Sequence, residues 1–176
     1  MLESLAFALV KTLISFMFQQ HLEESQAVRM EGAPAWYYRQ AENQLCESAF
    51  AQGGLEAVEA SKSNARAQLV TRINRAMDVV IYDNFRNRRD PAERDLIDRF
   101  RLDADLPVFV DGSAVDENLE YREQQRTAYA RACLPKEKLV SYQTERVGKL
   151  RKSVTLHRRD RGFEEMDADV GKPAKK

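Results

Sequence analysis

The chain has 176 residues with 28 basic and 28 acidic side chains, so its formal net charge is zero. This length fits one domain with extensions, and a neutral chain has no overall attraction to nucleic acid or anionic lipid, although local patches remain possible. Two cysteines are too few for a disulfide scaffold, and the two histidines, His21 and His157, have no metal-ligand spacing. Composition thus excludes a disulfide-rich mini-protein and a histidine metal centre.

Residues 1–18 are strongly apolar, but Lys11 interrupts them near the middle. They lack the basic start and the cleavage pattern of a secretory signal, and a bilayer span needs ~20 apolar residues. Three roles stay open: a helix packed in an oligomer, a membrane anchor, or an unusual signal sequence. A helix on the core of its own domain is the fourth, less favoured reading, because large side chains surround the helical cylinder. The candidate contacts with other copies or with lipid are Phe7, Leu9, Leu13, Phe16 and Phe18.

The helix is expected to continue to about residue 31, where Gly32 and Pro34 end it. Trp36 and Tyr37 follow. They fit either an aromatic plug at the end of the core or a contact with a neighbouring subunit or a ligand. Residues 45–51 alternate like a strand, with Cys46 and Phe50 on one face, and a glycine pair at 53–54 then indicates a turn.

Residues 54–85 predict one long helix without proline. Apolar or small residues recur in steps of three and four, and the start of the helix is rich in alanine. Small side chains allow a helix to approach a sheet closely. The predicted buried stripe consists of Leu55, Val58, Ser61, Ala65, Leu69, Ile73, Ala76, Met77, Val80 and Ile81.

A basic turn follows, in which Arg86, Arg88 and Arg89 are candidate anion-binding residues. Asp90 and Pro91 suit the first positions of a second helix. We expect this helix to end at residues 105–107.

Residues 108–121 and 127–133 predict two strands joined as a hairpin by a short polar link. In the first strand, Val115, Glu117, Leu119 and Tyr121 should share one face. In the second strand the alanines at 128, 130 and 132 share one face, and Tyr129, Arg131 and Cys133 share the other. The flat alanine face suits close packing by the alanine-rich start of the long helix.

A last helix is expected from Pro135. Its apolar stripe is Leu139, Tyr142, Val147, Leu150 and Val154. A charged segment of residues 158–176, basic and then acidic, is expected to be flexible. The predicted organisation is an apolar helix over 1–31, an α+β domain over 32–157 and this tail. The fold class is α+β, with a small antiparallel sheet packed by the long helix and flanked by N-terminal and C-terminal helices.

Cys46 and Cys133 each lie on a predicted strand. If both strands belong to one sheet, the two residues can form a disulfide. The alternative is two buried thiols.

Four segments together resemble the Lpp20-like lipoprotein family of bacterial envelopes. They are PAWYY at 34–38, LCESAFAQGG at 45–54, NARAQL at 64–69 and TAYARACLPKEKL at 127–139. They match the family's Pro-x-Trp entry, its strand leading into an alanine-bearing helix, and its Tyr-x-x-Ala strand before a final helix. The resemblance covers about residues 33–147. It implies a dodecin-like fold with a helix on a small antiparallel sheet, and a protein of the periplasm or membrane that can assemble into rings, as flagellar disk lipoproteins do. The chain departs from the family in lacking a lipidated N-terminal cysteine.

No motif for catalysis, for a phosphate loop or for a metal is present, and the resemblance transfers no catalytic residue. We therefore expect no enzyme, no cofactor and no metal, but a non-catalytic envelope protein that forms a homo-oligomer such as a ring, tube or filament. Membrane contact through the N-terminal helix is a further expectation. Two alternatives stay open: a dodecin-like small-ligand binder, and a less expected nucleic-acid binder that uses Arg86–Arg89 and the basic end of the last helix.

Overall fold

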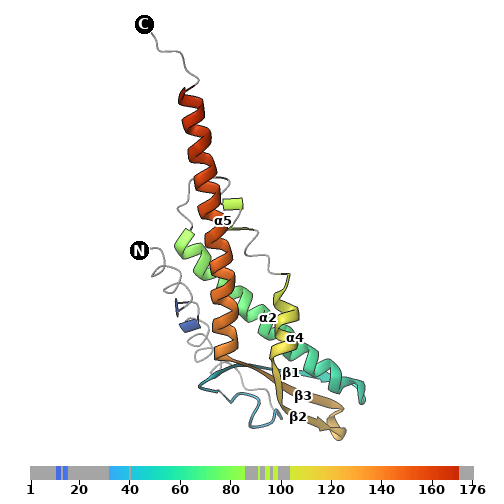
Figure 1. The fold of residues 1–176 in the computed structure, drawn as a ribbon. Coiled ribbons are helices and arrows are strands. Elements are labelled where there is room, and N and C mark those ends of the chain that lie inside the picture. Colours follow the sequence, from blue (N-terminus) through green and yellow to red (C-terminus); the bar gives the residue numbers. More distant parts are fainter. Residues whose placement is uncertain are drawn as a thin grey trace.

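The computed structural model describes residues 11–12, 14–15, 32–39, 41–85, 91, 94–95, 97–98 and 104–170. The order of its elements is β1 (Gln44–Gln52), α2 (Glu56–Phe85), α4 (Leu106–Ser113), β2 (Val115–Arg122), a short 3-10 turn (Glu123–Gln125), β3 (Thr127–Pro135) and α5 (Lys136–Val170) (Figure 1). The fold is α+β, with a three-stranded antiparallel sheet and helices, as the alternating segments predict.

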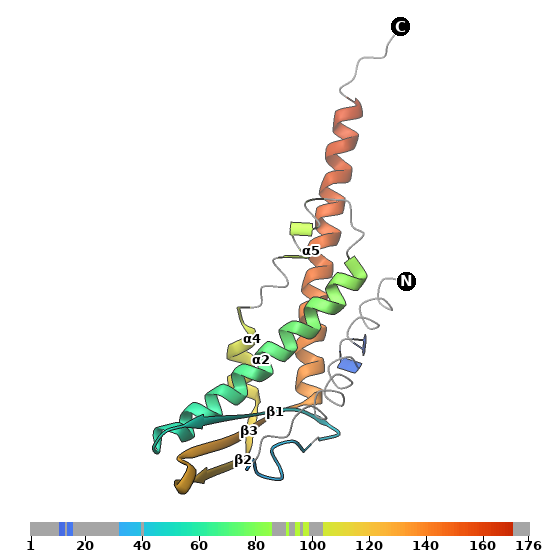
Figure 2. The ribbon, with the colours of Figure 1, turned by 180° about the vertical axis from the view of Figure 1, so that it is seen from behind.

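β3 is the central strand of the sheet, in the order β1-β3-β2. It pairs with β1 without interruption from Gln44↔Pro135 to Gln52↔Thr127. α2 covers one face of the sheet, and residues 32–39 pass the opposite face (Figures 1 and 2). We call this second face the outer face. The central strand is consequently buried at every position from Thr127 to Leu134.

α2 packs on the sheet through a ridge of small residues that broadens into larger ones. Ala57 is 1% exposed, and Ala65, Leu69 and Ile73 are fully buried one turn apart. This alanine-rich start fits against the alanine face of β3, where Ala128, Ala130 and Ala132 are also buried. The predicted stripe is wrong at its beginning: Leu55 precedes the helix and is 78% exposed, because α2 starts at Glu56 and turns Ala57 toward the sheet.

α4 corrects two predictions. Residues 105–107 were expected to end a helix and residues 108–113 to be strand, but Leu106–Ser113 is helical with Pro107 in its first turn. Leu106 and Val110, four residues apart, are both fully buried, whereas Val108 between them is 74% exposed. Their common burial against the core overrides the strand preference of the valines.

β2 starts at Val115 and contains an irregularity that changes its faces. Asp116 pairs with Ala132 and Asn118 pairs with Arg131, so Glu117 is an extra residue between the two pairs. Val115 and Glu117 therefore lie on the side of Cys133, whereas Leu119 and Tyr121 lie on the alanine side. The predicted common face of these four residues is wrong. Asp116 faces α2, where its carboxylate accepts a hydrogen bond from Arg66 at 3.1 Å.

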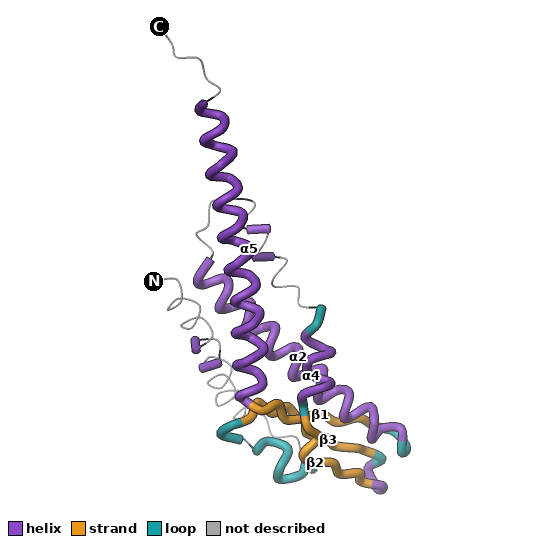
Figure 3. Tube along the Cα trace, in the orientation of Figure 1, coloured by secondary structure: helices purple, strands orange, loops and turns teal. Residues whose placement is uncertain are grey.

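α5 is longer than predicted. It runs from Lys136 to Val170, so the first thirteen residues of the expected flexible tail are helical, and residues 171–176 lie outside the described chain. Among its described side chains, Leu139, Gln143 and Val147 are buried, while the predicted Tyr142 and Leu150 are partly buried. The side chain of the predicted Val154 lies outside the described part. The C-terminal part of α5 extends beyond the other described elements (Figure 3).

The predicted N-terminal apolar helix falls mostly outside the described residues. Lys11, Thr12, Ile14 and Ser15 are helical, and Ile14 is buried in the core cluster. The five described residues between 91 and 98 are helical too, in the region where a second helix is predicted.

Candidate functional site

The outer face of the sheet gathers the chemically distinctive side chains of the described chain. It is lined by Thr127, Tyr129, Arg131 and Cys133 of β3, which alternate with the alanines that face α2. Their partners on β1 place Phe50 beside Tyr129 and Ser48 beside Arg131. This alternation is the predicted one, and it brings aromatic, cationic and sulfur groups onto one surface.

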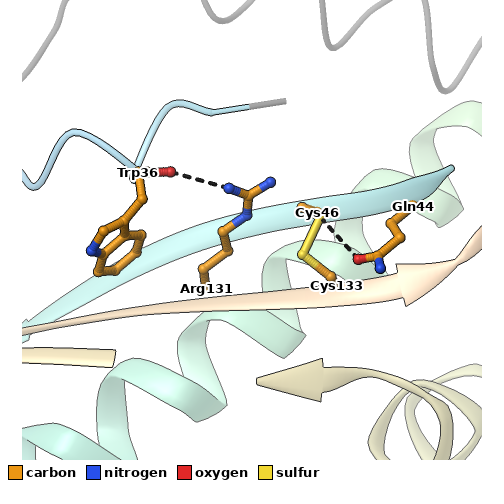
Figure 4. Close-up of a disulfide and its surroundings, with 5 residues drawn as sticks. All are labelled: Trp36, Gln44, Cys46, Arg131 and Cys133. Atoms are coloured by element: carbon orange, nitrogen blue, oxygen red, sulfur yellow. Dashed lines mark hydrogen bonds between the residues drawn. A yellow bond between two sulfur atoms is a disulfide. The ribbon is translucent and has the colours of Figure 1, made fainter. Parts of the chain in front are cut away.

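Cys46 and Cys133 form a disulfide at this face, as one of the two open readings predicts (Figure 4). They are directly opposite each other in the register, with Cα atoms 4.1 Å apart. That separation suits a pair without mutual backbone hydrogen bonds, the narrower of the two antiparallel spacings. Both residues are at most 2% exposed. Gln44 Oε1 lies 3.9 Å from Cys46 Sγ, but an oxidised sulfur has no proton to donate, so this is a contact only.

Arg131 is a buried cation at 3% exposure. Its guanidinium donates a hydrogen bond from Nη1 to the carbonyl oxygen of Trp36 at 3.2 Å (Figure 4). Burial lowers the pKa of Arg131, and Arg39 lowers it further, whereas Glu117 raises it. Because the ordinary pKa of arginine lies far above neutrality, the side chain stays charged, and it ties residues 32–39 to the central strand.

Aromatic side chains cover the rest of the outer face. Tyr37 packs edge-on against Tyr129 with ring centroids 5.7 Å apart, and it also contacts Trp36 and Tyr38. Burial, followed by the nearby Tyr38, Tyr129 and Glu47, raises the pKa of Tyr37 to about 12. These contacts agree with the aromatic-plug reading of this segment, although Trp36 and Tyr37 are only partly buried.

Glu117 lies beside the disulfide, and its carboxylate and the two sulfur atoms are within 4.8 Å of one another. Metal binding by cysteine requires the thiolate, and both sulfurs are oxidised here. In this state the cluster offers a single exposed carboxylate.

Two arginines of α2, the buried Arg72 and the partly buried Arg66, join structural elements. Arg72 Nη1 of α2 lies 2.6 Å from Glu47 Oε1 of β1, with both side chains largely buried. Arg66 of α2 lies 3.1 Å from Asp116 of β2 and 4.0 Å from Asp111 of α4. These pairs fix the helix over the sheet, since each arginine binds carboxylates of neighbouring elements.

The remaining predicted contact and anion-binding residues cannot be placed relative to this site. Phe7, Leu9, Leu13, Phe16 and Phe18, and the basic residues Arg86, Arg88 and Arg89, lie outside the described residues. Sequence reasoning did not single out Arg131 or Glu117. The position of Arg131 between Tyr129 and Cys133 on one strand face was a usable signal. Glu117 shares a predicted strand face with Val115, and Val115 pairs with Cys133, but only the strand register reveals this pairing.

In comparisons with known proteins, no family model, curated protein or solved structure matches this chain. Within the described residues, no helix combines the length and the apolar character that a membrane crossing requires.

Proposed function

We propose that this protein is a non-catalytic structural protein of the bacterial cell envelope that assembles with copies of itself. The observation that carries this proposal is the Cys46–Cys133 disulfide in the middle of the sheet. Disulfides form and persist in oxidising compartments such as the periplasm and are rare in the reducing cytoplasm. The resemblance of residues 33–147 to Lpp20-like envelope lipoproteins points to the same compartment.

A structural role is supported by the way the buried charges are used. Arg72 and Arg66 bind carboxylates of the sheet and of α4, and Arg131 binds a backbone carbonyl. An active site instead needs a nucleophile or a general base within reach of a second reactive group. The charged groups described above hold helices and loops on the sheet, which suits a rigid building block.

Self-assembly is supported by the composition of residues 1–18. Ile14 is buried in the core of its own chain, but large apolar side chains are distributed around the whole predicted helix. One core cannot cover all sides of such a helix, so protein or lipid has to cover the rest. Lys11 disfavours a simple span, since a lysine at the centre of a bilayer costs about 3 kcal/mol on insertion scales. In a bundle of copies, Lys11 can meet Glu3 or Glu23 of a neighbour, and zero net charge removes long-range repulsion between copies. Membrane contact through the same segment is the competing use.

The test is to delete residues 1–20 and to measure mass by light scattering. We expect full-length protein to form a homo-oligomer and the truncated protein to be folded and smaller. Deleting residues 171–176 is the control and should leave the mass per particle unchanged apart from the lost residues. A truncated protein that keeps the assembly size would show that residues 1–20 do not drive assembly, and binding of only the full-length chain to vesicles would favour the membrane role.

A second candidate function is a small-ligand binder of the dodecin type. The observation that favours it is the aromatic cluster of the outer face, where Phe50 is 40% exposed beside Tyr129 and Tyr37. Planar ligands stack on such rings. A coloured or fluorescent compound that co-purifies with the protein and changes the fluorescence of Trp36 would support this function over a purely structural one.

A further inference from the structure

The projecting part of α5 carries its charges in two separate blocks. Residues 149–161, here called the basic segment, contain six basic residues and one acidic residue. Residues 162–170, the acidic segment, contain four acidic residues and no basic ones. Both segments belong to the continuous helix Lys136–Val170.

The described lysine and arginine side chains of the basic segment are exposed to solvent. Lys152, Arg159 and Arg161 are exposed, and Leu156 among them is 49% exposed. Lys149 Nζ lies 2.7 Å from Glu145 Oε1, and Arg159 Nε lies 3.5 Å from Asp160 Oδ1. Such exposed pairs are weak and exchange readily with other partners. This end of the helix extends away from the sheet in both views (Figures 1 and 2).

The order of the two blocks is unfavourable for an isolated helix. The C-terminus of a helix carries partial negative charge, so acidic residues destabilise it and basic residues stabilise it. The last turn of α5 has no basic residue but contains Asp167 and Asp169, and Glu164 and Glu165 come just before it. A positively charged partner beside the acidic segment would remove this conflict.

We propose that the projecting ends of α5 from two copies of this chain pack antiparallel, with the basic segment of each on the acidic segment of the other. This inference rests on the proposed self-assembly and identifies one contact within it. A parallel arrangement would place like charges opposite one another, so the charge order selects the antiparallel one. A two-fold axis makes both halves of the contact identical. The segments are centred near residues 155 and 166, so the axis passes between residues 160 and 161. Residues 151–170 then pair with one another, and these 20 residues span about 30 Å.

The first experiment is disulfide trapping in the full-length chain. The native cysteines are already bridged, so a cysteine introduced by Asp160→Cys is the single free thiol. Mild oxidation should convert most of the protein to a covalent dimer at low salt. The yield should fall several-fold in 1 M salt, where the Debye length shrinks from about 8 Å to about 3 Å. The control is Lys138→Cys, which lies near the sheet end of α5 and should not cross-link.

The second experiment exchanges the charges in the Asp160→Cys background. One variant reverses Arg158, Arg159 and Arg161 to Glu, and the other reverses Glu164, Glu165 and Asp167 to Lys. Each variant alone should lose the cross-link, because its two segments then carry the same sign. An equal mixture should recover it as a heterodimer, because each segment again meets its opposite. The acid-to-lysine variant places basic residues near the C-terminus of α5, which stabilises the helix. Loss of the dimer in this variant therefore cannot come from unfolding of the helix.

A matched control for net charge reverses the exposed carboxylates Glu42, Glu123 and Glu137 to Lys and should keep the cross-link. Cross-linking that ignores salt and both reversals, or a mixture that fails to recover it, would overturn the antiparallel contact. So would salt-dependent oligonucleotide binding by the basic segment without any cross-link. Light scattering distinguishes failure of the α5 contact from failure of the proposed self-assembly. A full-length oligomer without the α5 cross-link would contradict the α5 contact alone. A full-length monomer would contradict both the α5 contact and self-assembly.

Discussion

At the scale of single residues, Gln143 is the buried side chain whose environment fits it least. It is fully buried on α5 in line with Leu139 and Val147, and neither its amide nitrogen nor its amide oxygen has a hydrogen-bond partner in the described chain. Leaving a buried polar group unpaired costs about 1 to 3 kcal/mol. Gln143→Leu, which keeps a similar volume, should therefore stabilise the protein by that amount.

The measurement is the melting temperature, which should rise by a few degrees per kcal/mol in a chain of this size. Gln52→Leu on the exposed end of β1 is the control and should change it little. A destabilised Gln143→Leu protein would mean that the amide forms contacts in the assembly that are absent from the single chain.

At the scale of elements, α4 contains a buried and an exposed apolar residue, Leu106 and Val108, within one turn of helix. Leu106→Ala removes a fully buried side chain and should cost 2–5 kcal/mol, since the site cannot collapse onto the lost volume. Val108→Ala removes a side chain that is 74% exposed and should change stability by less than about 0.5 kcal/mol. Chemical unfolding of both variants tests the helical register of this segment. In a strand both residues would lie on the same face, so equal losses would restore the strand interpretation.

At the scale of the whole molecule, the disulfide links residues 87 positions apart. In the chain-entropy model a loop of this length stabilises the folded state by about 4 to 5 kcal/mol. The double variant Cys46→Ala, Cys133→Ala should lose about this much in urea unfolding, and wild-type protein in a thiol reductant should lose a similar amount. Thiol counting on unfolded protein should find no reactive thiol before reduction and two after it. Two thiols in protein made in an oxidising compartment would remove the bridge and the main support for an envelope location.

The sequence by itself determined the elements whose pattern is local and strong. The long helix over 56–85, the strand at 44–52 and the alanine face of β3 follow from side-chain periodicity, because one buried face dictates the spacing of apolar residues. The possible meeting of Cys46 and Cys133 followed from placing two strands in one sheet. The charge blocks of α5 are also visible in the sequence, although their helical state beyond residue 157 was not predicted.

Tertiary structure alone decided the features that depend on contacts between segments far apart in the sequence. Residues 106–113 are helical because Leu106 and Val110, one helical turn apart, are both buried in the core. The valines of this segment would also suit a strand. Leu119 and Tyr121 lie on the alanine face, although Val115 pairs with Cys133 on the other face, because β2 gains one residue against β3, which no alternation pattern signals. Arg131 is buried because residues 32–39 cross the outer face and offer it the carbonyl of Trp36, 95 residues earlier in the chain. These outcomes depend on burial and hydrogen bonding between segments far apart in sequence, and a local pattern contains neither.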